Sequence, residues 1–382
     1  MLCFSLINST IVSAGELMQN KAVIIQGSKI VDIIDEKSLP SGIKRIDLKG
    51  FYLSPGFIDL QINGAGGAFF GGNPTEDGLK TMEQTLLAQG TTGFLVTAAT
   101  NSFSIHRKMI DYAIDYHPRA IGNYLGLHLE GPYINPLCKG AHPVHLIKKA
   151  TLDEVKSLLD RAEGEIRMMT LAPELQPEEV IRYLDAVGIV LSIGHSAASY
   201  DEAMHFFTGR KRMATHLYNG MQPMHHRHPG LIPAIFRARP YTSIVVDGIH
   251  VAYPMVRLAK QVLGDSLILV TDGATPCSVG AYHHTFKGDR YVTIDTNGKE
   301  TLSGSALTLL KAISNCVLHV GIALPEAINM ATLYPAQVLH IDDHVGQIRS
   351  GYDADFVIFD SDFHIHKVYF KGKEKSDSSI LN

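Results

Sequence analysis

Short runs of hydrophobic residues, each with the length of a β-strand, recur along the middle of the chain and mostly alternate with segments of helical pattern. The runs are Phe57–Gln61, Gly93–Ala98, Tyr124–Leu129, Ile166–Leu171, Ile189–Ile193, Met213–His216, Ser243–Asp247 and Leu267–Thr271. Continuous apolar runs of this kind are typical of parallel strands that are buried on both faces. Eight of them in succession predict an α/β fold with a closed (β/α)8 barrel, the TIM barrel.

The segments between these runs carry signals for the starts of helices. Thr151-Leu-Asp-Glu154 and Ser199-Tyr-Asp-Glu202 each have the spacing of a capping box. An open, doubly wound sheet would also alternate strands with helices. That layout is disfavoured because no glycine-rich dinucleotide fingerprint follows the first strands.

Both ends of the chain have a β pattern. Ala22–Gln26 and Lys29–Ile34 are rich in β-branched residues and are joined by Gly27-Ser28, a hairpin signal. Asp355–Phe359 and Ile365–Tyr369 look similar near the other end. We therefore predict one small β-sandwich domain formed by residues 1–52 and 345–382, and a catalytic barrel formed by residues 53–344.

One segment after the eighth strand interrupts the barrel pattern. Thr296-Asn297-Gly298 is a strong hairpin-turn signal, so we predict an inserted β-hairpin near residues 281–302. Two further helices, Ser305–Val320 and Pro325–His340, are expected to close the barrel after it.

The composition is that of a globular protein with a large core, since 45% of the 382 residues are hydrophobic and 19% are charged. The net charge is only −4 and no basic run occurs, so we expect no nucleic-acid partner. Met1–Val12 lacks a basic start and is too short to span a bilayer, so we expect neither a signal peptide nor a membrane partner.

The four cysteines, Cys3, Cys138, Cys277 and Cys316, are far apart and none has Cys-x-x-Cys spacing. This pattern argues against a disulfide framework and against a thiolate zinc site. A reducing, cytoplasmic location fits it best.

Polar residues of the metal-binding and acid types fall where the predicted strands end. They are Asp59, Gln61, Asn63, Glu130, His195, His216, Asn219, Asp247, His250 and Asp272. In a (β/α)8 barrel the carboxyl ends of the strands carry the chemistry. The sequence therefore predicts that these side chains share one rim of the barrel.

Glu130, His195 and His216 form a set of one oxygen and two nitrogen ligands. Three protein ligands and one open position are typical of a catalytic divalent site. The metal would lower the pKa of a bound water from 15.7 to about 7 and so supply a nucleophile. Asp272 is placed to accept that water's proton and to deliver it to a leaving amine. We expect one ion per subunit, with zinc first and ferrous iron, cobalt or manganese as alternatives.

Each of these residues also has a purely structural interpretation. A histidine at a strand end can be a satisfied core group, Glu130 could cap the following turn, and Asp272 could form an Asx turn. The functional interpretation is favoured because all four residues are predicted to lie on one rim, with Asp272 at the end of the last strand.

The same residues lie in longer strings that follow one another in order. The strings are Ser54-Pro-Gly-Phe-Ile-Asp59, His128-Leu-Glu-Gly-Pro132, Gly194-His-Ser196, Thr215-His-Leu-Tyr-Asn219, Asp247-Gly-Ile-His250, Thr271-Asp-Gly273, Leu302-Ser-Gly-Ser305 and Leu333-Tyr-Pro-Ala336. Together they resemble the N-acetylglucosamine-6-phosphate deacetylases of the amidohydrolase superfamily, from about Gly50 to Asp360. The second and fourth strings are the most specific to that family.

This resemblance implies hydrolysis of N-acetylglucosamine 6-phosphate to glucosamine 6-phosphate and acetate. By it, Glu130, His195 and His216 bind the metal, and Asp272 is the general base and acid. His142 resembles the family's residue that contacts the substrate carbonyl and the sugar. A donor there would stabilise the charge that develops on the acetyl oxygen.

The resemblance also implies how the sugar phosphate is held. Asn219, the backbone of Gly220, Arg227 and His250 resemble the group that binds the sugar and its 6-phosphate. In the family the arginine reaches in from a neighbouring subunit, so the resemblance implies a homodimer. The alternative for Arg227 is a solvated loop cation.

Two positions depart from related patterns. Many barrel amidohydrolases have His-x-His after the first strand, which supplies a second metal, whereas this chain has Gln61-Ile62-Asn63. Amides are poor ligands for transition metals, so these residues predict a vacant second-metal position and one ion. Relatives often have alanine where this chain has Gly220, which should matter little if the backbone does the binding.

Two other functions are compatible with parts of this pattern. A barrel amidohydrolase could act on another N-acyl sugar, such as N-acetylgalactosamine 6-phosphate, or on a cyclic amide of the dihydropyrimidine type. A catalytically silent barrel could bind a sugar phosphate as a sensor, although a pure binder has no use for both a metal and a proton acceptor.

Overall fold

The computed structural model describes residues 3–294 and 298–375, and these residues form two compact units. The first unit contains the residues up to Asp59, Gln84–Gly93 and the residues from Thr308 onward. The second contains Leu60–Glu83 and Phe94–Leu307. The domain boundaries near residues 52 and 344 remain our prediction.

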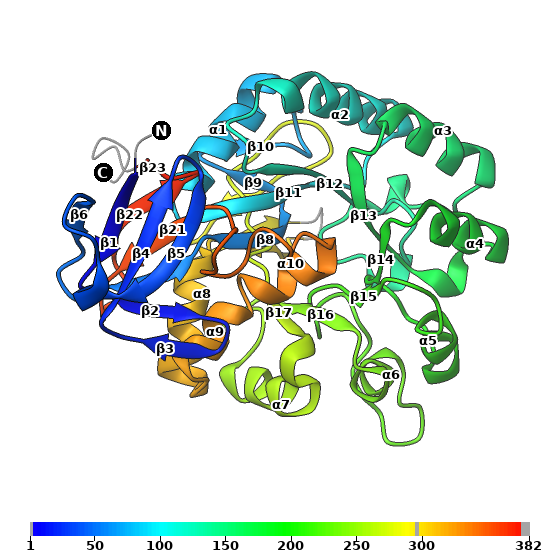
Figure 1. Ribbon diagram of the computed structural model, residues 1–382. Helices are drawn as coiled ribbons and strands as arrows, with labels where there is room; N and C mark the ends of the chain where they lie inside the picture. The colour runs from blue at the N-terminus through cyan, green and yellow to red at the C-terminus, as the bar shows by residue number, and fades with distance from the viewer. Residues whose placement is uncertain (1–2, 295–297, 376–382) are drawn as a thin grey trace. The chain divides into compact units, whose positions relative to one another are not determined.

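The largest sheet has eight strands in the order β17-β16-β15-β14-β13-β12-β11-β8 (Figure 1). Its strands are β8 Phe57–Ile62, β11 Thr91–Ala99, β12 Tyr124–Glu130, β13 Ile166–Leu171, β14 Val190–Ile193, β15 Arg212–Ala214, β16 Tyr241–Ile244 and β17 Leu267–Leu269. From β11 to β17 each strand runs parallel to the next. All eight predicted strands are therefore present, in the predicted order.

Backbone hydrogen bonds just beyond β17 return to the end of β8. The Asp272 N–H donates to the Gln61 carbonyl (3.0 Å), and the Asn63 N–H donates to the Gly273 carbonyl (2.8 Å). Ile62 and Gly273 form a parallel bridge between them. These bonds close the sheet, which confirms the predicted barrel.

Three strands end earlier than predicted, at Ala214, Ile244 and Leu269. The backbone turns into the left-handed region at His216 (φ 33°) and at Asp272 (φ 48°), so neither residue has the extended conformation of a regular strand. After β16, the Asp247 carboxylate accepts the N–H groups of Ile249 and His250, which fixes a turn. His216, Asp247 and Asp272 therefore lie on loops after these three strands.

Helices connect the strands and expose one face to solvent. Their bounds are α1 Glu76–Ala88, α2 Phe103–Tyr116, α3 Leu152–Ala162, α4 Glu178–Val187, α5 Tyr200–Phe206, α6 Leu231–Ala238 and α7 Tyr253–Leu263. Both predicted caps are present: the Thr151 side chain accepts from the Glu154 N–H, and Ser199 forms a complete capping box with Glu202. In the part of the chain that the structure describes, no helix has the length and hydropathy to cross a membrane.

The chain after the barrel is more broken than predicted. It forms α8 Leu309–Asn315, a π-helical turn Cys316–Val320, α9 Leu324–Asn329 and α10 Leu333–Leu339. The prediction of a helix from Ser305 was wrong, because Ser305 belongs to a strand and the helix begins after its N-cap, Thr308. The second predicted helix is split, since Thr332 is not helical and Pro335 has no N–H for an internal bond.

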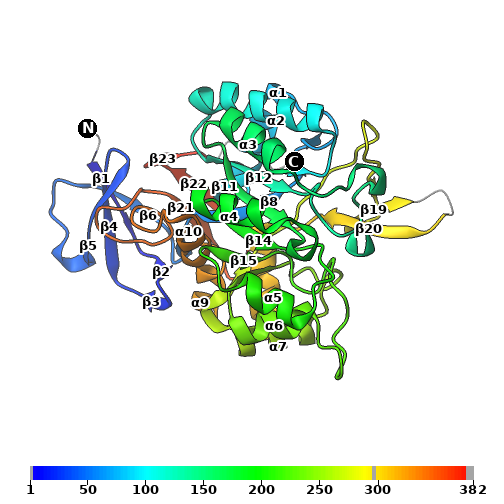
Figure 2. The same cartoon turned by 90° about the vertical axis from the view of Figure 1, so that its right-hand side faces the viewer.

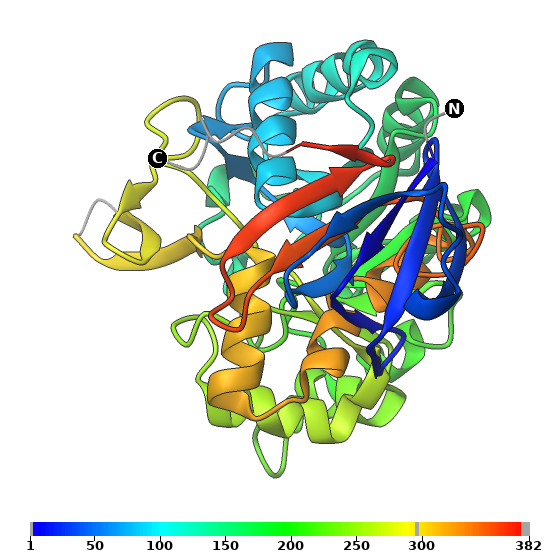
Figure 3. The ribbon, with the colours of Figure 1, turned by 60° about the vertical axis from the view of Figure 1, so that its left-hand side comes forward.

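The first unit contains two sheets: one is built from N-terminal strands alone, and the other combines strands from both ends of the chain (Figure 3). One has the order β5-β4-β1-β6 and the other β23-β22-β21-β7-β2-β3. The strands are β1 Cys3–Ile7, β2 Thr10–Ser13, β3 Glu16–Met18, β4 Lys21–Gln26, β5 Lys29–Asp35, β6 Lys44–Asp47, β7 Tyr52–Pro55, β21 Phe356–Phe359, β22 Ile365–Phe370 and β23 Lys373–Glu374. Buried residues of both sheets, including Leu6, Ile25, Leu53 and Phe356, share one core. The predicted β structure at both ends is confirmed.

The predicted hairpin is also present in the second unit, where it projects from the barrel strands (Figure 2). It is formed by β19 Arg290–Ile294 and β20 Glu300–Ser305, and a third antiparallel strand, β18 Thr285–Phe286, pairs with β19. A separate small hairpin, β9 Gly64–Ala65 and β10 Ala68–Phe69, follows β8. Of the predicted turn Thr296-Asn297-Gly298, the first two residues lie outside the described residues. The hairpin follows β17, so it leaves the barrel on the rim that carries the strand ends.

A buried carboxyl group in the first unit leads to a prediction about stability. The Asp355 carboxylate accepts the Lys371 N–H (2.6 Å), but burial raises the pKa of Asp355 to about 7, and Asp353 adds to the shift. Because an unfolded aspartate has a pKa of about 3.9, stability is lost as the pH rises from about 4 to about 7. Asp355→Asn stays neutral and keeps an acceptor for Lys371. We expect its Tm to exceed the native Tm by a few degrees at pH 8 and to match it near pH 4, in thermal melts; identical pH profiles would contradict this.

Candidate active site

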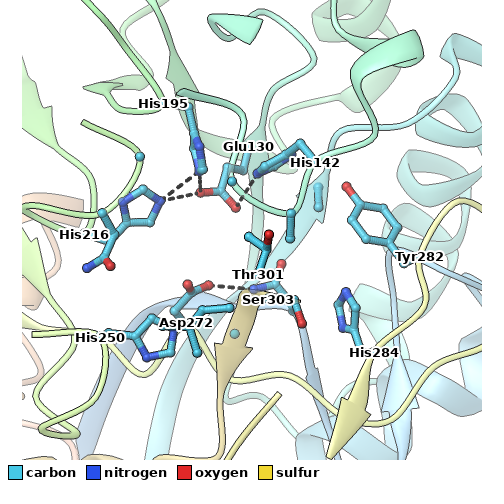
Figure 4. A pocket seen from close by; sticks show the side chains of 18 of the residues that line it. Glu130, His142, His195, His216, His250, Asp272, Tyr282, His284, Thr301 and Ser303 are labelled. Carbon is cyan, nitrogen blue, oxygen red and sulfur yellow. Dashed lines mark hydrogen bonds and ion pairs between the residues drawn. The ribbon is translucent and has the colours of Figure 1, made fainter. Parts of the chain in front are cut away.

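Four predicted residues lie at or just beyond the ends of four barrel strands and meet in the second unit (Figure 4). Glu130 is the last residue of β12, while His195, His216 and Asp272 lie just beyond β14, β15 and β17. The three latter residues have φ values of 47°, 33° and 48°. Left-handed backbone is uncommon in residues other than glycine and often accompanies function. Here all three side chains line the same cavity (Figure 4).

The side chains of Glu130, His195 and His216 form a tight, buried cluster. One atom from each lies within 4.8 Å of the others. His216 Nε2 is 3.1 Å from Glu130 Oε1 and 3.0 Å from His195 Nε2, and His195 Nε2 is 3.3 Å from Glu130 Oε1. Three donor atoms therefore converge on a single point, as a metal site requires.

A hydrogen bond behind the cluster sets the tautomer of His195. Its Nδ1 is 2.8 Å from the carbonyl oxygen of Cys138, which can only accept, so Nδ1 carries the proton. The lone pair of neutral His195 is then on Nε2 and points at the nearby nitrogen of His216. A cation between the two rings would satisfy this arrangement, so the donor set fits a divalent metal.

The electrostatics of the cluster also favour a cation. Burial opposes ionisation of Glu130, but its close contacts with the imidazoles of His195 and His216 hold the pKa of its carboxyl well below the ordinary value. Burial acts to lower the pKa of His216, yet its hydrogen bond to Glu130 raises it. Glu130 is thus a carboxylate, the form in which it can bind a metal.

The two amide residues after β8 orient the acidic groups. Gln61 Nε2 donates to Glu130 Oε1 (2.9 Å) and to Asp272 Oδ1 (3.4 Å), and Asn63 Nδ2 donates to Asp272 Oδ1 (2.7 Å). An amide nitrogen that donates to a carboxylate offers no lone pair to a metal. The place that histidines would occupy in a two-metal site is therefore filled by hydrogen-bond donors.

Asp272 has the properties of a proton acceptor. Burial raises the pKa of its carboxyl, and the charge of Glu130 raises it further, while His216, His250 and His195 oppose the shift. A carboxylate with a raised pKa is a stronger base and holds a proton more readily near neutral pH.

The cluster forms one side of a cavity of about 220 Å³. Among the predicted residues, those that line it are Asn63, Glu130, His142, His195, His216, Asn219, Gly220, His250 and Asp272. The His142 ring packs edge-on against His195 (4.4 Å between centroids), and burial, followed by His195, lowers the pKa of His142 to about 3. His250 is held by Asp247, with 2.6 Å from Nδ1 to Oδ2. The structure therefore brings most of the predicted site together.

Gly220 allows the chain to approach His195 closely. It has a φ of 61°, and a Cβ atom there would lie 2.7 Å from His195 Nδ1. A side chain at this position would displace the imidazole or the loop. Glycine at position 220 therefore leaves room for the imidazole of His195 where it lies in this chain.

Arg227 lies elsewhere. It is exposed, on a loop with His225, His226 and His228, and it is not among the described residues that line the cavity. Its backbone N–H donates to His225 Nδ1 (3.3 Å), and the rings of His225 and His228 stack. Within one chain, the structure does not bring Arg227 to the predicted site.

Sequence reasoning missed one wall of the cavity. It consists of Phe69, Tyr282, His284 and the β20 residues Thr301, Leu302, Ser303 and Gly304. Two observations pointed to it: the hairpin was predicted directly after the eighth strand, and Leu302-Ser-Gly-Ser305 was one of the matched strings. Residues of a hairpin inserted on the catalytic rim can reach the site.

Comparisons with known proteins agree with this arrangement. Residues 52–375 match the amidohydrolase family, and residues 3–53 match the NagA composite domain. N-acetylglucosamine-6-phosphate deacetylase from Haemophilus influenzae is 35% identical, over 98% of this chain and 100% of that protein. The human deacetylase of the same name is 32% identical, over 96% and 94%. The crystal structure of the Pasteurella multocida deacetylase has a TM-score of 0.92 at 32% identity, over 98% and 100%.

Proposed function

The chain belongs to the amidohydrolase family and, within it, to the N-acetylglucosamine-6-phosphate deacetylases, and from this membership we propose that it hydrolyses N-acetylglucosamine 6-phosphate to glucosamine 6-phosphate and acetate. The observation that carries the proposal is the buried Glu130, His195 and His216 cluster beside Asp272, in a cavity on the catalytic rim of a barrel. A Mycobacterium smegmatis deacetylase, 25% identical with a TM-score of 0.87, has been solved in complex with that sugar phosphate.

Glu130, His195 and His216 are the residues that would hold a divalent metal ion, with zinc as our first choice and iron, cobalt or manganese as alternatives. Bound there, the ion would polarise the acetyl carbonyl and make a water molecule acidic enough to attack at neutral pH. One ion per subunit is proposed, because Gln61 and Asn63 donate hydrogen bonds where a second set of ligands would be needed.

Asp272 and His142 would move the proton and stabilise the developing charge. Asp272 accepts a proton from the attacking water and then transfers it to the amine nitrogen as the carbon–nitrogen bond breaks. The same proton thus leaves with glucosamine 6-phosphate, while the water oxygen stays with acetate. His142, neutral because of its low pKa, donates an N–H to the acetyl oxygen.

The phosphate and sugar would be held by Asn219, the Gly220 backbone, His250 and Arg227. Arginine binds phosphate with two parallel hydrogen bonds, which suits this role. Because Arg227 is exposed and outside the cavity of its own chain, we propose a homodimer in which it reaches the neighbouring site.

We place the reaction in the cytoplasm. Cys3, Cys138 and Cys277 carry free thiols, and Cys3 is exposed to solvent. Thiols of this kind persist in a reducing compartment.

The reaction is tested by acetate release from N-acetylglucosamine 6-phosphate and from unphosphorylated N-acetylglucosamine. The enzyme is first freed of metal with a chelator and then assayed with and without zinc. We expect turnover of the phosphorylated sugar only when metal is present, and little of the other sugar. The proposal would be contradicted if the enzyme with metal restored hydrolysed neither sugar but opened a dihydropyrimidine ring. That result would favour a cyclic amide as substrate.

The role of Arg227 is tested by substitution and by mixing subunits. Arg227→Ala should raise KM for the phosphorylated sugar by about 10- to 100-fold, since it removes a charged contact to phosphate. Arg210→Ala, which removes another exposed arginine, is the control and should change little. When Arg227→Ala and Asp272→Asn chains are co-expressed, random pairing should leave roughly a quarter of the sites intact. Absence of this rescue would show that Arg227 does not act across the dimer.

A further inference from the structure

A histidine that the proposed reaction does not use lines the cavity on the side opposite the Glu130 cluster (Figure 4). His284 pairs with Cys277 through two backbone hydrogen bonds of 2.7 and 3.1 Å, so its backbone is fixed. Its ring packs edge-on against Phe69 (4.6 Å between centroids) and Tyr282 (5.5 Å). The imidazole is therefore held rigidly in the wall of the cavity.

Both ring nitrogens of His284 lack a hydrogen-bond partner among the described residues, although the residue is only 5% exposed. Buried polar groups are nearly always paired, and an orphaned one calls for an explanation. Its neighbour shows the usual case, because the Tyr282 hydroxyl donates to the Thr100 carbonyl (2.8 Å). A donor and an acceptor held unused in a cavity wall are suited to a ligand that enters the cavity.

The charge state of His284 narrows the chemistry of that ligand. Burial lowers the pKa of His284 to about 4, and His283 adds to the shift, so the ring is neutral near pH 7. A neutral imidazole has one donor and one acceptor. A hydroxyl group both donates and accepts, so it can pair with whichever ring nitrogen faces it, whereas a phosphate dianion can pair only with the N–H. Among the groups of a sugar phosphate, a hydroxyl therefore matches His284 best.

We propose that His284 binds a ring hydroxyl of the amino sugar, on a carbon next to the one that carries the acetamido group, and so contributes to sugar specificity. This inference rests on the proposed function. The scissile amide must lie at the Glu130 cluster. Asn219 and His250 also line the cavity, and His250 lies across it from His284 (Figure 4). The hydroxyls that flank the acetamido carbon are the ones remote from the 6-phosphate, and they are within reach of the opposite wall.

The test combines enzyme variants with deoxy substrates. His284→Phe keeps an aromatic ring and removes both polar atoms, and His284→Gln keeps a donor and an acceptor. With N-acetylglucosamine 6-phosphate, His284→Phe should raise KM by about 10- to 100-fold and change kcat by less than about threefold. His284→Gln should restore most of the loss. With the native enzyme, KM should rise by a similar factor when the 1-deoxy or the 3-deoxy analogue replaces the parent sugar. His284→Phe should have the same KM for that analogue as for the parent sugar.

A structural role for His284 makes different predictions. Removal of an orphaned polar group should leave the Tm of His284→Phe equal to or above the native Tm. The control Tyr282→Phe loses a satisfied hydroxyl, so it should lower the Tm and leave the deoxy penalties unchanged. An unchanged KM in His284→Phe would overturn the role of His284 but not the proposed function. So would an equal rise in KM on the deoxy analogue in that variant and in the native enzyme. Failure of the native enzyme to act on the parent sugar phosphate would overturn the proposed function as well.

Discussion

Asp272→Asn is expected to lower kcat for acetate release by about 10²- to 10⁴-fold, the range that positioned proton transfer contributes in enzymes. The substitution removes the basic oxygen but keeps an acceptor for the amide of Asn63, so the geometry should persist. The metal content should not fall, because Asp272 is outside the cluster of Glu130, His195 and His216. Steady-state kinetics and metal analysis on the same preparation measure both effects.

The pH profile provides a second measurement of the role of Asp272. Because burial raises the pKa of Asp272, native activity should fall as the pH drops through a value above that of an ordinary aspartate, where the base becomes protonated. The Asp272→Asn variant should lack this acid limb. Asp265→Asn is a matched control, since Asp265 is exposed and precedes the other end of β17. Full turnover by Asp272→Asn would remove our assignment of the proton acceptor.

The barrel could be predicted from the sequence because its strands are buried on both faces. Runs such as Tyr124–Leu129 and Ile166–Leu171 are therefore nearly continuous in hydrophobicity, and their number and order are visible in one sequence. Helix starts were predictable where a side chain caps the backbone, as at Thr151 and Ser199. The break near Thr332 was not, because residues on both sides of it favour a helix.

The ends of the strands were the least predictable part of the barrel. Val245 and Val246 are fully buried, so hydrophobicity extends the seventh strand, although the ladder has ended at Ile244. Burial and strand pairing are different properties, and a sequence pattern reports only burial. The left-handed turns at His216 and Asp272 depend on tertiary contacts that force an unfavourable backbone, which local propensity argues against.

The site itself was predictable only in part. Residues at strand ends converge because the fold places those ends on one rim, so Glu130, His195, His216 and Asp272 could be grouped from their positions in the sequence. The orienting bonds of Gln61 and Asn63 could not, because amide side chains in a sequence do not reveal which carboxylate they contact. His284 was missed for a related reason: its importance lies in the absence of a protein partner, which only coordinates can show.

Glu130→Gln is the substitution expected to have the largest effect, because it should remove both metal and activity. It replaces the only carboxylate of the cluster by an amide, a poor ligand for transition metals. We expect metal affinity to fall by at least about 100-fold, and kcat by at least about 10³-fold at metal concentrations that saturate the native enzyme. Competition with a coloured chelator measures the affinity, and acetate release measures the activity. Glu163→Gln, at an exposed glutamate before β13, is the control and should change neither.

A titration with added zinc would then separate a metal ligand from a proton acceptor. If Glu130 acts by holding the ion, a large excess of zinc should return part of the activity of Glu130→Gln, because mass action can offset a weaker site. The same excess should leave Asp272→Asn inactive, since its site is already filled and lacks only the base. A Glu130→Gln enzyme that keeps native zinc affinity would show that the cluster is not the metal site. Loss of zinc by both variants would show that Asp272 is itself a ligand, and the division of roles between the two carboxylates would be wrong.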